Sequence, residues 1–393
     1  MGVRLGNGNW GVKTSKLLAY NDASGMFFNK EFDFTRATTA TRVNKSGLIE
    51  VVDTNIPRID FTDDTKGHLL LEPTSFNYDV NSADLSTGWT ASTGATASVE
   101  TGTTPFGISG NIKRLSGATN SPPSWVDNVN ALKKQYTVLA SDPASTFTFS
   151  VYVKSAGSTT VNIQLRNNTA GPSATTGAIT LSSDWQRVSV TLAVTTTTTA
   201  IGVVIGGTDG DILLSGAQLE SKTFATSLIP TSGTTVTRNA DVCNGSGAAQ
   251  DFNSTEGVLY AEIAALADDT ISRAVSISNS TIQNTAEIFY NSGSNQVSFR
   301  IRASNANVTV QNRTVSDRTQ FVKVALKYKD GDIEGFINGV KEVDRTDSFT
   351  FSASLSELAF DRGGDQSHFE GKIREVRTYR TALTDAELIA LTT

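Results

Sequence analysis

The sequence predicts an all-β protein in which two tandem antiparallel β-sandwiches follow an extended N-terminal segment. Runs of alternating apolar and polar residues recur at intervals of about ten residues between turn residues, as expected for half-buried strands. Gly, Ser, Thr and Asn are abundant, with 32 glycines alone, whereas helical patterning is nearly absent. A chain of 393 residues exceeds what one hydrophobic core normally organises, so we expect more than one domain.

The composition excludes several classes of protein and site. Charged residues make up only 18% of the chain, the net charge is −6 and no basic block is present, so we expect no nucleic-acid-binding surface. Cys243 is the single cysteine and can form neither an intrachain disulfide nor a zinc cluster. Residues 1–13 lack the apolar core of a signal peptide, and no apolar run approaches the ~20 residues of a membrane span. We therefore expect synthesis in a cytoplasm and no membrane insertion.

Residues 1–75 are expected to form an attachment or oligomerisation segment rather than a compact domain. Four phenylalanines lie close together in it: Phe27, Phe28, Phe32 and Phe34. The segment buries little apolar surface by itself, so these side chains need a partner surface, most simply another copy of the chain. The alternative is that they fill the core of the following domain.

Residues 76–232 are predicted to form the first sandwich. Strands at 147–156 and 159–168 carry apolar residues at alternate positions, and the small polar residues between them predict a hairpin. A final core strand at 211–219 precedes Pro230, which stops pairing because it lacks a backbone donor. An extended connector should follow.

Residues 233–393 are predicted to form the second sandwich. Its alternating strands are expected at 257–266, 286–291, 296–303, 307–313 and 321–329. Asp330-Gly331 and Asn338-Gly339 lie between apolar-alternating runs and supply the positive φ of tight hairpin turns.

A short helix is predicted near residue 390. Thr384 and Glu387 have the spacing of a capping box, and Leu383 and Leu388 are placed as a hydrophobic staple around it. This helix should cap an otherwise β-rich chain.

Two parts of the chain resemble sugar-binding families. The C-terminal part resembles the laminin-G-like or concanavalin A-like lectin sandwich in FINGV (336–340), FEGKIREVRTYR (369–380) and TALTDAELIAL (381–391). The middle part resembles jelly-roll carbohydrate-binding modules in STGW (86–89), DWQRVSVTL (184–192) and LSGAQLESKTFATSLIPTSG (214–233). Because the sandwich fold hosts many functions, neither resemblance alone assigns a sugar site.

The N-terminal part is similar to bacteriophage tail-fibre and other virion proteins. The similarity lies in WGVKTSKLLAYND (10–22), FDFTRATTATRVNKSGLIE (32–50), IPRIDF (56–61) and LLLEPTSFN (69–77). It implies a virion structural protein, a tail fibre or appendage, released by lysis. Its expected partners are other virion proteins, copies of itself in a homotrimer, and host cell-surface polysaccharide. The alternatives are a decoration or fibre-base protein that makes only protein contacts, and a polysaccharide depolymerase.

Catalysis is not expected. His68 and His368 stand alone, without a G-x-S-x-G or H-E-x-x-H motif, and favour ordinary loop or strand-end positions. The acidic pairs Asp63-Asp64 and Asp268-Asp269 are adjacent in sequence, so on a strand they point to opposite faces. A depolymerase would need two carboxyl groups facing each other across a cleft, which would have to come from distant parts of the chain. We assign no catalytic residue and no metal ligand.

Two places are candidates for ligand binding. Trp125 follows two prolines in a polar loop and could stack on a pyranose ring, or else pack over the sandwich edge. A glycine-rich loop carries the other candidates, which are Asp361, Arg362, Asp365 and Gln366. That loop could bind sugar or calcium, since oxygen ligands suit a hard cation, or could be a solvated turn.

Overall fold

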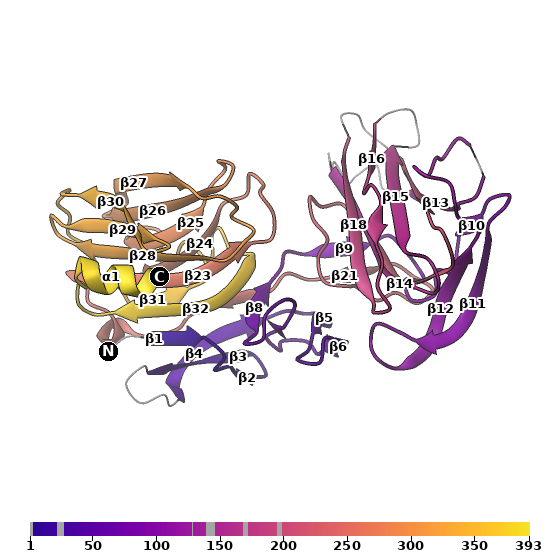
Figure 1. The fold of residues 1–393 in the computed structure, drawn as a ribbon. Helices are drawn as coiled ribbons and strands as arrows, with labels where there is room; N and C mark the ends of the chain where they lie inside the picture. The colour runs from indigo at the N-terminus through magenta and orange to yellow at the C-terminus, as the bar shows by residue number, and fades with distance from the viewer. Residues whose placement is uncertain (1–2, 22–26, 128, 139–145, 168–171, 195–198) are drawn as a thin grey trace. The chain divides into compact units, whose positions relative to one another are not determined.

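The computed structural model describes residues 3–21, 27–127, 129–138, 146–167, 172–194 and 199–393, and only the backbone of residues 21 and 27–30. The chain is nearly all β and forms two compact units (Figure 1). Unit 1 contains residues 1–47, 52–73 and 239–393, and unit 2 contains residues 48–51 and 74–238. In the described part of the chain, no helix is long and apolar enough to span a membrane.

Unit 1 is a sandwich of two antiparallel sheets around one large core. Among the described residues, the larger sheet has twelve strands: β1 (Val3–Gly6), β2 (Gly11–Lys13), β3 (Lys16–Asn21), β4 (Phe27–Thr35), β7 (Ile59–Asp60), β8 (His68–Leu71), β22 (Val242–Asn244), β23 (Glu256–Ala265), β28 (Val322–Lys329), β29 (Ile333–Ile337), β30 (Val340–Arg345) and β32 (Gly371–Tyr379). The smaller sheet has five: β24 (Arg273–Ser278), β25 (Thr285–Tyr290), β26 (Gln296–Ala303), β27 (Ala306–Thr314) and β31 (Glu357–Ala359).

The N-terminal strands belong to the same sheet as the C-terminal ones. β1 pairs antiparallel with β32, with Leu5 opposite Val376, and β8 pairs with another part of β32. Phe32 and Phe34 are buried in the core of unit 1, whereas the side chains of Phe27 and Phe28 lie outside the described residues. The two units therefore differ from the three consecutive parts expected from the sequence, because strand pairing between distant segments gives residues 1–47 and 52–73 their core. A role of this segment in oligomerisation stays a prediction.

The hairpin series of unit 1 follows the sequence pattern. β28, β29 and β30 are consecutive antiparallel neighbours, joined at the two predicted turns. Gly331 and Gly339 have φ of +71° and +82°, the left-handed conformation that glycine adopts without steric cost. The expected strands at 257–266, 286–291, 296–303, 307–313 and 321–329 match β23, β25, β26, β27 and β28 to within a residue.

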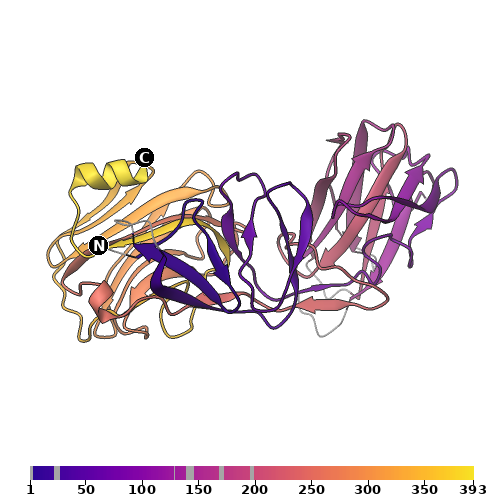
Figure 2. The ribbon, with the colours of Figure 1, turned by 90° about the horizontal axis from the view of Figure 1, so that it is seen from below.

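The single α-helix described, α1 (Asp385–Thr392), has the predicted capping box. The Thr384 hydroxyl accepts from the Glu387 amide, and the Glu387 carboxylate accepts from the Thr384 amide at 2.8 Å. Leu388 is buried beside Tyr260 and Phe336, and Leu383 packs on the same cluster. α1 itself lies against β28, β29 and β30 of the larger sheet (Figure 2). A 3-10 turn, η1 (Ala249–Asp251), precedes β23.

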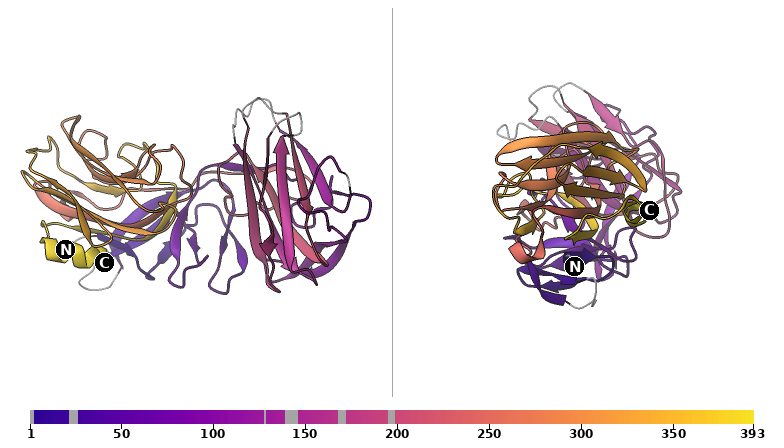
Figure 3. Two further views of the ribbon diagram at one scale, coloured as in Figure 1. Left: turned by 45° about the horizontal axis from the view of Figure 1, so that its top comes forward. Right: turned by 90° about the vertical axis from the view of Figure 1, so that its left-hand side faces the viewer.

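Unit 2 is a second antiparallel sandwich (Figure 3). In its described part, one sheet has six strands: β10 (Thr90–Ala91), β13 (Leu132–Thr137), β15 (Thr160–Asn167), β16 (Ser173–Thr175), β17 (Ile179–Thr180) and β19 (Ala200–Gly206). The other has five: β11 (Thr96–Thr103), β12 (Ser109–Ser116), β14 (Thr146–Ser155), β18 (Gln186–Ala193) and β20 (Ile212–Glu220). β9 (Ser75–Asn77) and β21 (Val236–Arg238) pair with each other where the chain enters and leaves this unit. The remaining short strands are β5 (Ala40–Val43) and β6 (Ile49–Val52).

The predicted hairpin between residues 147–156 and 159–168 is wrong. β14 pairs with β18 and β20, whereas β15 pairs with β16, β17 and β19 in the opposite sheet. Their apolar faces, including Phe149 on β14 and Ile163 on β15, lie in one core. The four residues between the strands thus carry the chain from one sheet to the other, because burial of both apolar faces outweighs local pairing.

Candidate functional site

The outer face of the six-stranded sheet in unit 2 presents two rows of residues, polar at every position except Val204 and Gly202. In the first row, Thr90 is opposite Lys133, Lys133 opposite Val204, and Val204 opposite Gln164. In the second row, Gln135 is opposite Gly202 and Gly202 opposite Arg166. Alternate residues of β13, β19 and β15, such as Leu132, Val203 and Leu165, are in the core, so these rows point away from it.

The loop between β12 and β13 places Trp125 on this face. A Cβ atom at Gly202 would lie 3.0 Å from Cε3 of the Trp125 ring, and one at Gly206 would lie 3.0 Å from Cβ of Pro123. The absence of side chains at these two glycines lets the loop approach β19 closely. The Trp125 side chain is half-buried: the ring packs on the sheet, as one of the two alternatives expected, and remains partly exposed, whereas its contact with a sugar stays a prediction.

A groove of about 460 Å³ lies beside the Trp125 ring. It is lined by Gly88, Thr90, Trp125, Lys133, Lys134 and Gln135, all from unit 2. Sugar sites typically combine an aromatic surface with a few polar groups that fix orientation. This groove has both components.

The two lysines in the groove have different surroundings. Lys134 Nζ is 2.9 Å from Asp79 Oδ2 and donates to the Thr87 carbonyl at 2.8 Å, so its charge is paired within unit 2. Lys133 Nζ donates to the Trp125 carbonyl at 2.6 Å and lies 5.7 Å from the centre of the Trp125 ring. Lys133 thus both positions the loop and presents a cation to the groove.

Burial lowers the pKa of Lys133, Asp127 opposes this shift, and the nearby positive charge of Arg166 adds to it. Apart from the paired Lys134, the cations on this face are Lys133 and Arg166, and no carboxylate of the described residues lies within 4.0 Å of their charged nitrogens. Gln164 Oε1, Arg166 Nε and Asn120 Nδ2 are buried without a hydrogen-bond partner in the described part of the chain. Such groups normally find a partner in protein, water or ligand.

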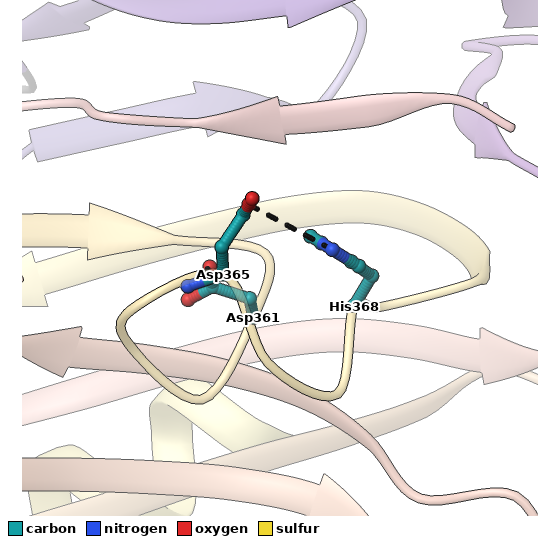
Figure 4. Close-up of side chains that lie close together, drawn as sticks. All are labelled: Asp361, Asp365 and His368. Atoms are coloured by element: carbon teal, nitrogen blue, oxygen red, sulfur yellow. Dashed lines mark hydrogen bonds and ion pairs between the residues drawn. The ribbon is translucent and has the colours of Figure 1, made fainter. Parts of the chain in front are cut away.

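The other predicted site lies in the loop between β31 and β32. It brings Asp361, Asp365 and His368 together, with one potential ligand atom from each within 4.8 Å of the others (Figure 4). His368 Nε2 is 3.7 Å from Asp365 Oδ1. The sequence predicted no site role for His368, although its spacing of three from Asp365 within one loop was a usable signal.

Asp361 mainly shapes the loop. Its buried carboxylate accepts hydrogen bonds from the Gly363 amide at 2.6 Å, the Asp365 amide at 3.1 Å and Nδ2 of Asn244 at 3.0 Å. Burial raises the pKa of Asp361, and the backbone bond from Gly363 opposes the shift.

Arg362 and Gln366 do not join this cluster. The Arg362 guanidinium group turns toward Glu287 on β25, at 3.4 Å, and donates to the Ser272 hydroxyl at 3.0 Å. Gln366 is exposed, and its backbone carbonyl accepts from the Arg362 amide. Burial lowers the pKa of Arg362, and the Glu287 carboxylate opposes that shift.

The cluster of Asp361, Asp365 and His368 fits calcium poorly. Calcium takes six to eight oxygen ligands, whereas these side chains offer two carboxylates and an imidazole nitrogen. The Asp361 oxygens already accept three hydrogen bonds. A nitrogen and two carboxylates suit a transition metal better.

Unit 1 contains a polar pocket that the sequence did not reveal. It has a volume of about 540 Å³ and lies over the larger sheet, where Glu262 on β23 is directly opposite Glu375 on β32. Two facing carboxylates are what a glycosidase needs, but one of them must hold a proton. Here Arg374 lies 3.3 Å from Glu262, and Arg377 lies 2.8 Å from Glu375. The arrangement is an ion-pair network rather than an acid and a nucleophile.

His68 and the acidic pairs occupy structural positions. His68 is buried, and its two ring nitrogens have no hydrogen-bond partner in the described part of the chain. Asp268 accepts from the Asn295 amide and pairs with Arg318, and Asp269 pairs with Arg273 and, at 3.8 Å, also with Arg318, so both carboxylates are held in ion pairs.

Residues 259–389 match the family model described as the concanavalin A-like lectin/glucanases superfamily (Laminin_G_3). This match supports the resemblance of the C-terminal part of unit 1 to lectin domains of the laminin-G type. No curated protein matches the sequence.

Solved structures with related folds share little sequence with this chain. The CBM40 of Ruminococcus gnavus IT-sialidase, bound to α2,3 sialyllactose, is 19% identical with a TM-score of 0.32 and covers 38% of this chain and 94% of its own. Domain 4 of AbnA, a GH43 arabinanase from Geobacillus stearothermophilus in complex with arabinotriose, is 14% identical with a TM-score of 0.32. The match covers 39% of this chain and 73% of that structure's chain. Domains LG4-5 of the mouse laminin α1 chain are 10% identical with a TM-score of 0.26. The match covers 64% of this chain and 91% of the laminin chain.

Proposed function

We propose that this protein is a glycan-binding structural component of a bacteriophage particle, a tail fibre or appendage that attaches to host-surface polysaccharide. The observation that carries glycan binding is the half-exposed Trp125 ring beside a groove lined by Thr90, Lys133 and Gln135. The match of residues 259–389 to a lectin family supports the same function. The place in a virion is supported by the resemblance of the N-terminal part to tail-fibre proteins.

Attachment would be multivalent. A partly exposed ring and a small groove offer a weak single site, and several sites on one particle raise the effective concentration of each. We propose a homotrimer, made in the host cytoplasm and released within virions by lysis. Mass spectrometry of purified particles tests the location, and light scattering of the purified chain tests the copy number.

The Trp125→Ala variant tests glycan binding on an array of purified bacterial surface polysaccharides. We expect it to lose the binding of the wild type, because a sugar ring would stack on the aromatic face that alanine removes. The matched control is Trp185→Ala, which removes a half-buried tryptophan directly before β18 in unit 2, where its Nε1 donates to the Thr103 carbonyl. Equal binding by Trp125→Ala and the wild type would contradict the proposal.

A decoration or fibre-base protein is the second candidate, favoured by exposed apolar side chains on unit 2. Val51 and Ile108 are 56% and 65% exposed. Strand β6, which carries Val51, is next to the loop that carries Ile108, since the Ile49 amide donates to the Pro105 carbonyl at 3.1 Å. If this patch contacts other subunits, Val51→Ser with Ile108→Ser lowers the mass of the assembly without affecting polysaccharide binding. An unchanged mass would remove this support.

A further inference from the structure

We infer that the polar pocket of unit 1 is a second binding site, which takes a short neutral sugar through its adjacent hydroxyl groups. The pocket is built from unit 1 alone, so it shares no residue with the Trp125 groove of unit 2. The inference rests on the proposed glycan-binding function only for the class of ligand. It is carried by the walls of the pocket, by its balanced charges and by three polar groups with unused hydrogen-bonding capacity.

The floor of the pocket is the face of the larger sheet that points away from the core, since the alternate residues of β23 are core residues. Lys323 on β28 is opposite Glu262 on β23, and Glu262 is opposite Glu375 on β32. β32 has one extra residue, Arg374, where the register steps from Glu262 to Ile263. Such a bulge re-aims a side chain. It places the Arg374 guanidinium group beside Glu262, at 3.3 Å.

The walls come from three other segments of unit 1. Asn7 follows β1, residues 64–67 lie between β7 and β8, and Ala390 and Leu391 are in α1. The family match spans residues 259–389, so the N-terminal wall lies outside it. Pairing of β1 and β8 with β32 thus turns an open sheet face into a pocket of about 540 Å³, a size typical of small-molecule sites.

The central charges of the pocket are balanced by the protein itself. Arg374 Nε donates to Asp64 at 2.7 Å, and Arg377 pairs with Glu375 at 2.8 Å. An anionic ligand would compete with these carboxylates for the arginines, and a cationic ligand would compete with the arginines for the carboxylates. Either competition separates an ion pair that is partly withdrawn from water, which is costly. A neutral ligand avoids both costs.

Two lysines complete the lining, and neither requires an anion from a ligand. Lys66 Nζ donates to Oδ1 of Asn7 at 2.8 Å, and Lys323 Nζ donates to the backbone oxygen of Thr393 at 2.7 Å. Both hydrogen bonds are exposed to solvent, so water hydrates the two ammonium groups.

Three polar groups in the pocket have unused hydrogen-bonding capacity. Tyr260 is only 2% exposed, and its hydroxyl has no hydrogen-bond partner among the described residues. Within the described part of the chain, Glu262 accepts only from Arg374 Nη1, and Arg374 Nη2 has no acceptor. Tyr260 and Glu262 are two positions apart on β23 and therefore share a face. Polar groups in such positions normally bind protein, water or ligand.

Adjacent hydroxyl groups of a sugar match this set. A hydroxyl both donates and accepts, so one can donate to Glu262 and accept from Arg374 while its neighbour accepts from the Tyr260 hydroxyl. The bonds to the two charged groups are the stronger ones. Leu391 in the wall offers an apolar contact for the carbon atoms of the ring. A neutral sugar therefore uses all three groups without breaking an ion pair.

The test uses full-length Trp125→Ala protein, in which the groove of unit 2 has lost its aromatic ring. Saturation-transfer difference NMR measures its binding of free methyl glycosides of glucose, galactose, mannose and N-acetylglucosamine. We expect at least one of them to bind with a Kd on the order of 1 mM. A single site this weak does not retain a polysaccharide on a washed array, so the expected loss of array binding by Trp125→Ala is unaffected.

Two substitutions in this background test the residues. Glu262→Gln should weaken binding about tenfold, because a charged acceptor is lost, and Tyr260→Phe about fivefold, because a neutral hydrogen bond is lost. The matched controls are Glu256→Gln, on the same strand, and Tyr328→Phe, whose hydroxyl donates to the Asn253 carbonyl at 2.9 Å. Neither control residue lines the pocket, so both variants should bind like the parent. Circular dichroism shows whether each variant is folded.

The outcomes separate this pocket from the Trp125 groove. Tyr260→Phe keeps the ring and decides the case if Glu262→Gln does not fold. Equal binding by Tyr260→Phe and its control overturns the inference, and so does the absence of binding by all four glycosides. Methyl glucuronide, the acidic counterpart of methyl glucoside, overturns the neutral class if it binds more tightly. The array experiment with Trp125→Ala decides the proposed function independently of these results.

Discussion

The guanidinium group of Arg36 and the carboxylate of Asp241 form a fully buried ion pair, 2.9 Å between Nη1 and Oδ1, across 205 positions of sequence. Asp241 also pairs with Arg58, which pairs with Glu72 at 2.7 Å. The Glu72 amide donates to Asp241 Oδ2 at 2.9 Å. The chain leaves unit 1 after residue 73 and returns at residue 239, so this cluster holds together the two segments of unit 1 that flank unit 2.

Removing the shared anion of this cluster should destabilise unit 1. Asp241→Ala leaves two buried guanidinium groups short of a partner, so we expect the free energy of unfolding to fall by about 3–5 kcal/mol. Urea denaturation measures the change, and amide hydrogen exchange assigns it to unit 1. Asp344→Ala is the control, because that side chain is 68% exposed and should change stability by less than about 0.5 kcal/mol. A similar effect of both variants would show that the cluster is not specifically stabilising.

The buried imidazole of His68 should make stability depend on pH. Burial lowers its pKa from 6.5 to about 4; Asp60 and Asp64 oppose the shift, and Lys372 and Arg374 add to it. The unfolded chain therefore binds the proton more strongly, and the stabilisation is complete above pH 6.5 and is lost as the pH falls toward 4. Between pH 7 and pH 5 this group alone should remove about 2 kcal/mol.

The His68→Phe variant isolates that contribution. Phenylalanine keeps an aromatic ring next to Phe321, whose centre is 5.7 Å from that of His68, and takes up no proton. The difference in unfolding free energy between pH 7 and pH 5 should be smaller in this variant than in the wild type by about 2 kcal/mol. His368→Phe is the control, since that side chain is 32% exposed. Parallel pH profiles for wild type and His68→Phe would refute the prediction.

Calcium should have no effect on the stability of unit 1. The loop cluster supplies carboxylates only from Asp361 and Asp365, and the Asp361 oxygens already accept three hydrogen bonds. We expect the same melting temperature with about 1 mM calcium chloride and with a chelator, since binding would raise it by mass action. Differential scanning calorimetry measures it, with Asp365→Asn as the control that removes the exposed carboxylate. A melting temperature that rises when calcium is added, and that no longer rises in Asp365→Asn, would establish a calcium site.

A side chain at Gly202 should disturb the sugar groove without unfolding the sheet. The Cβ of Gly202→Val would lie 3.0 Å from the Trp125 ring, and its methyl groups would reach further, so the ring must move. We expect polysaccharide affinity to fall about tenfold, comparable to the loss of one good contact. Affinity electrophoresis measures binding, and tryptophan fluorescence reports the displacement. Unchanged affinity together with a displaced ring would show that Trp125 does not contact the ligand.

Strand positions could be predicted from the sequence far better than strand partners. Alternation of apolar residues is a local property, so β26 was placed at its observed limits, Gln296–Ala303. Strand pairing is not a local property: nothing in the sequence of β1 or of β32 indicates that these two strands pair with each other. The same limitation explains the wrong hairpin between β14 and β15, whose apolar faces meet across the core.

The residues of the two candidate sites could likewise be predicted where they are close in sequence, but not where they depend on strand pairing. Trp125 was identified from its loop, but the row that joins Gly202 to Arg166 depends on the register of three strands, which composition does not reveal. In the 361–368 loop, two of the predicted residues meet because they are close in sequence. Arg362 turns away because its partner, Glu287, comes from a strand far along the chain.

The pairing of β1 with β32 has a consequence for protein synthesis. Arg4 bonds to Glu375, 371 positions later, so the central part of the larger sheet cannot close until nearly the whole chain has left the ribosome. At roughly 5–20 residues per second, buried side chains such as Leu17 and Phe32 wait for tens of seconds without their final neighbours. Unit 2 has its strands between residues 74 and 238 and can fold during that time. The N-terminal strands are therefore the part of the nascent chain that most needs protection by a chaperone.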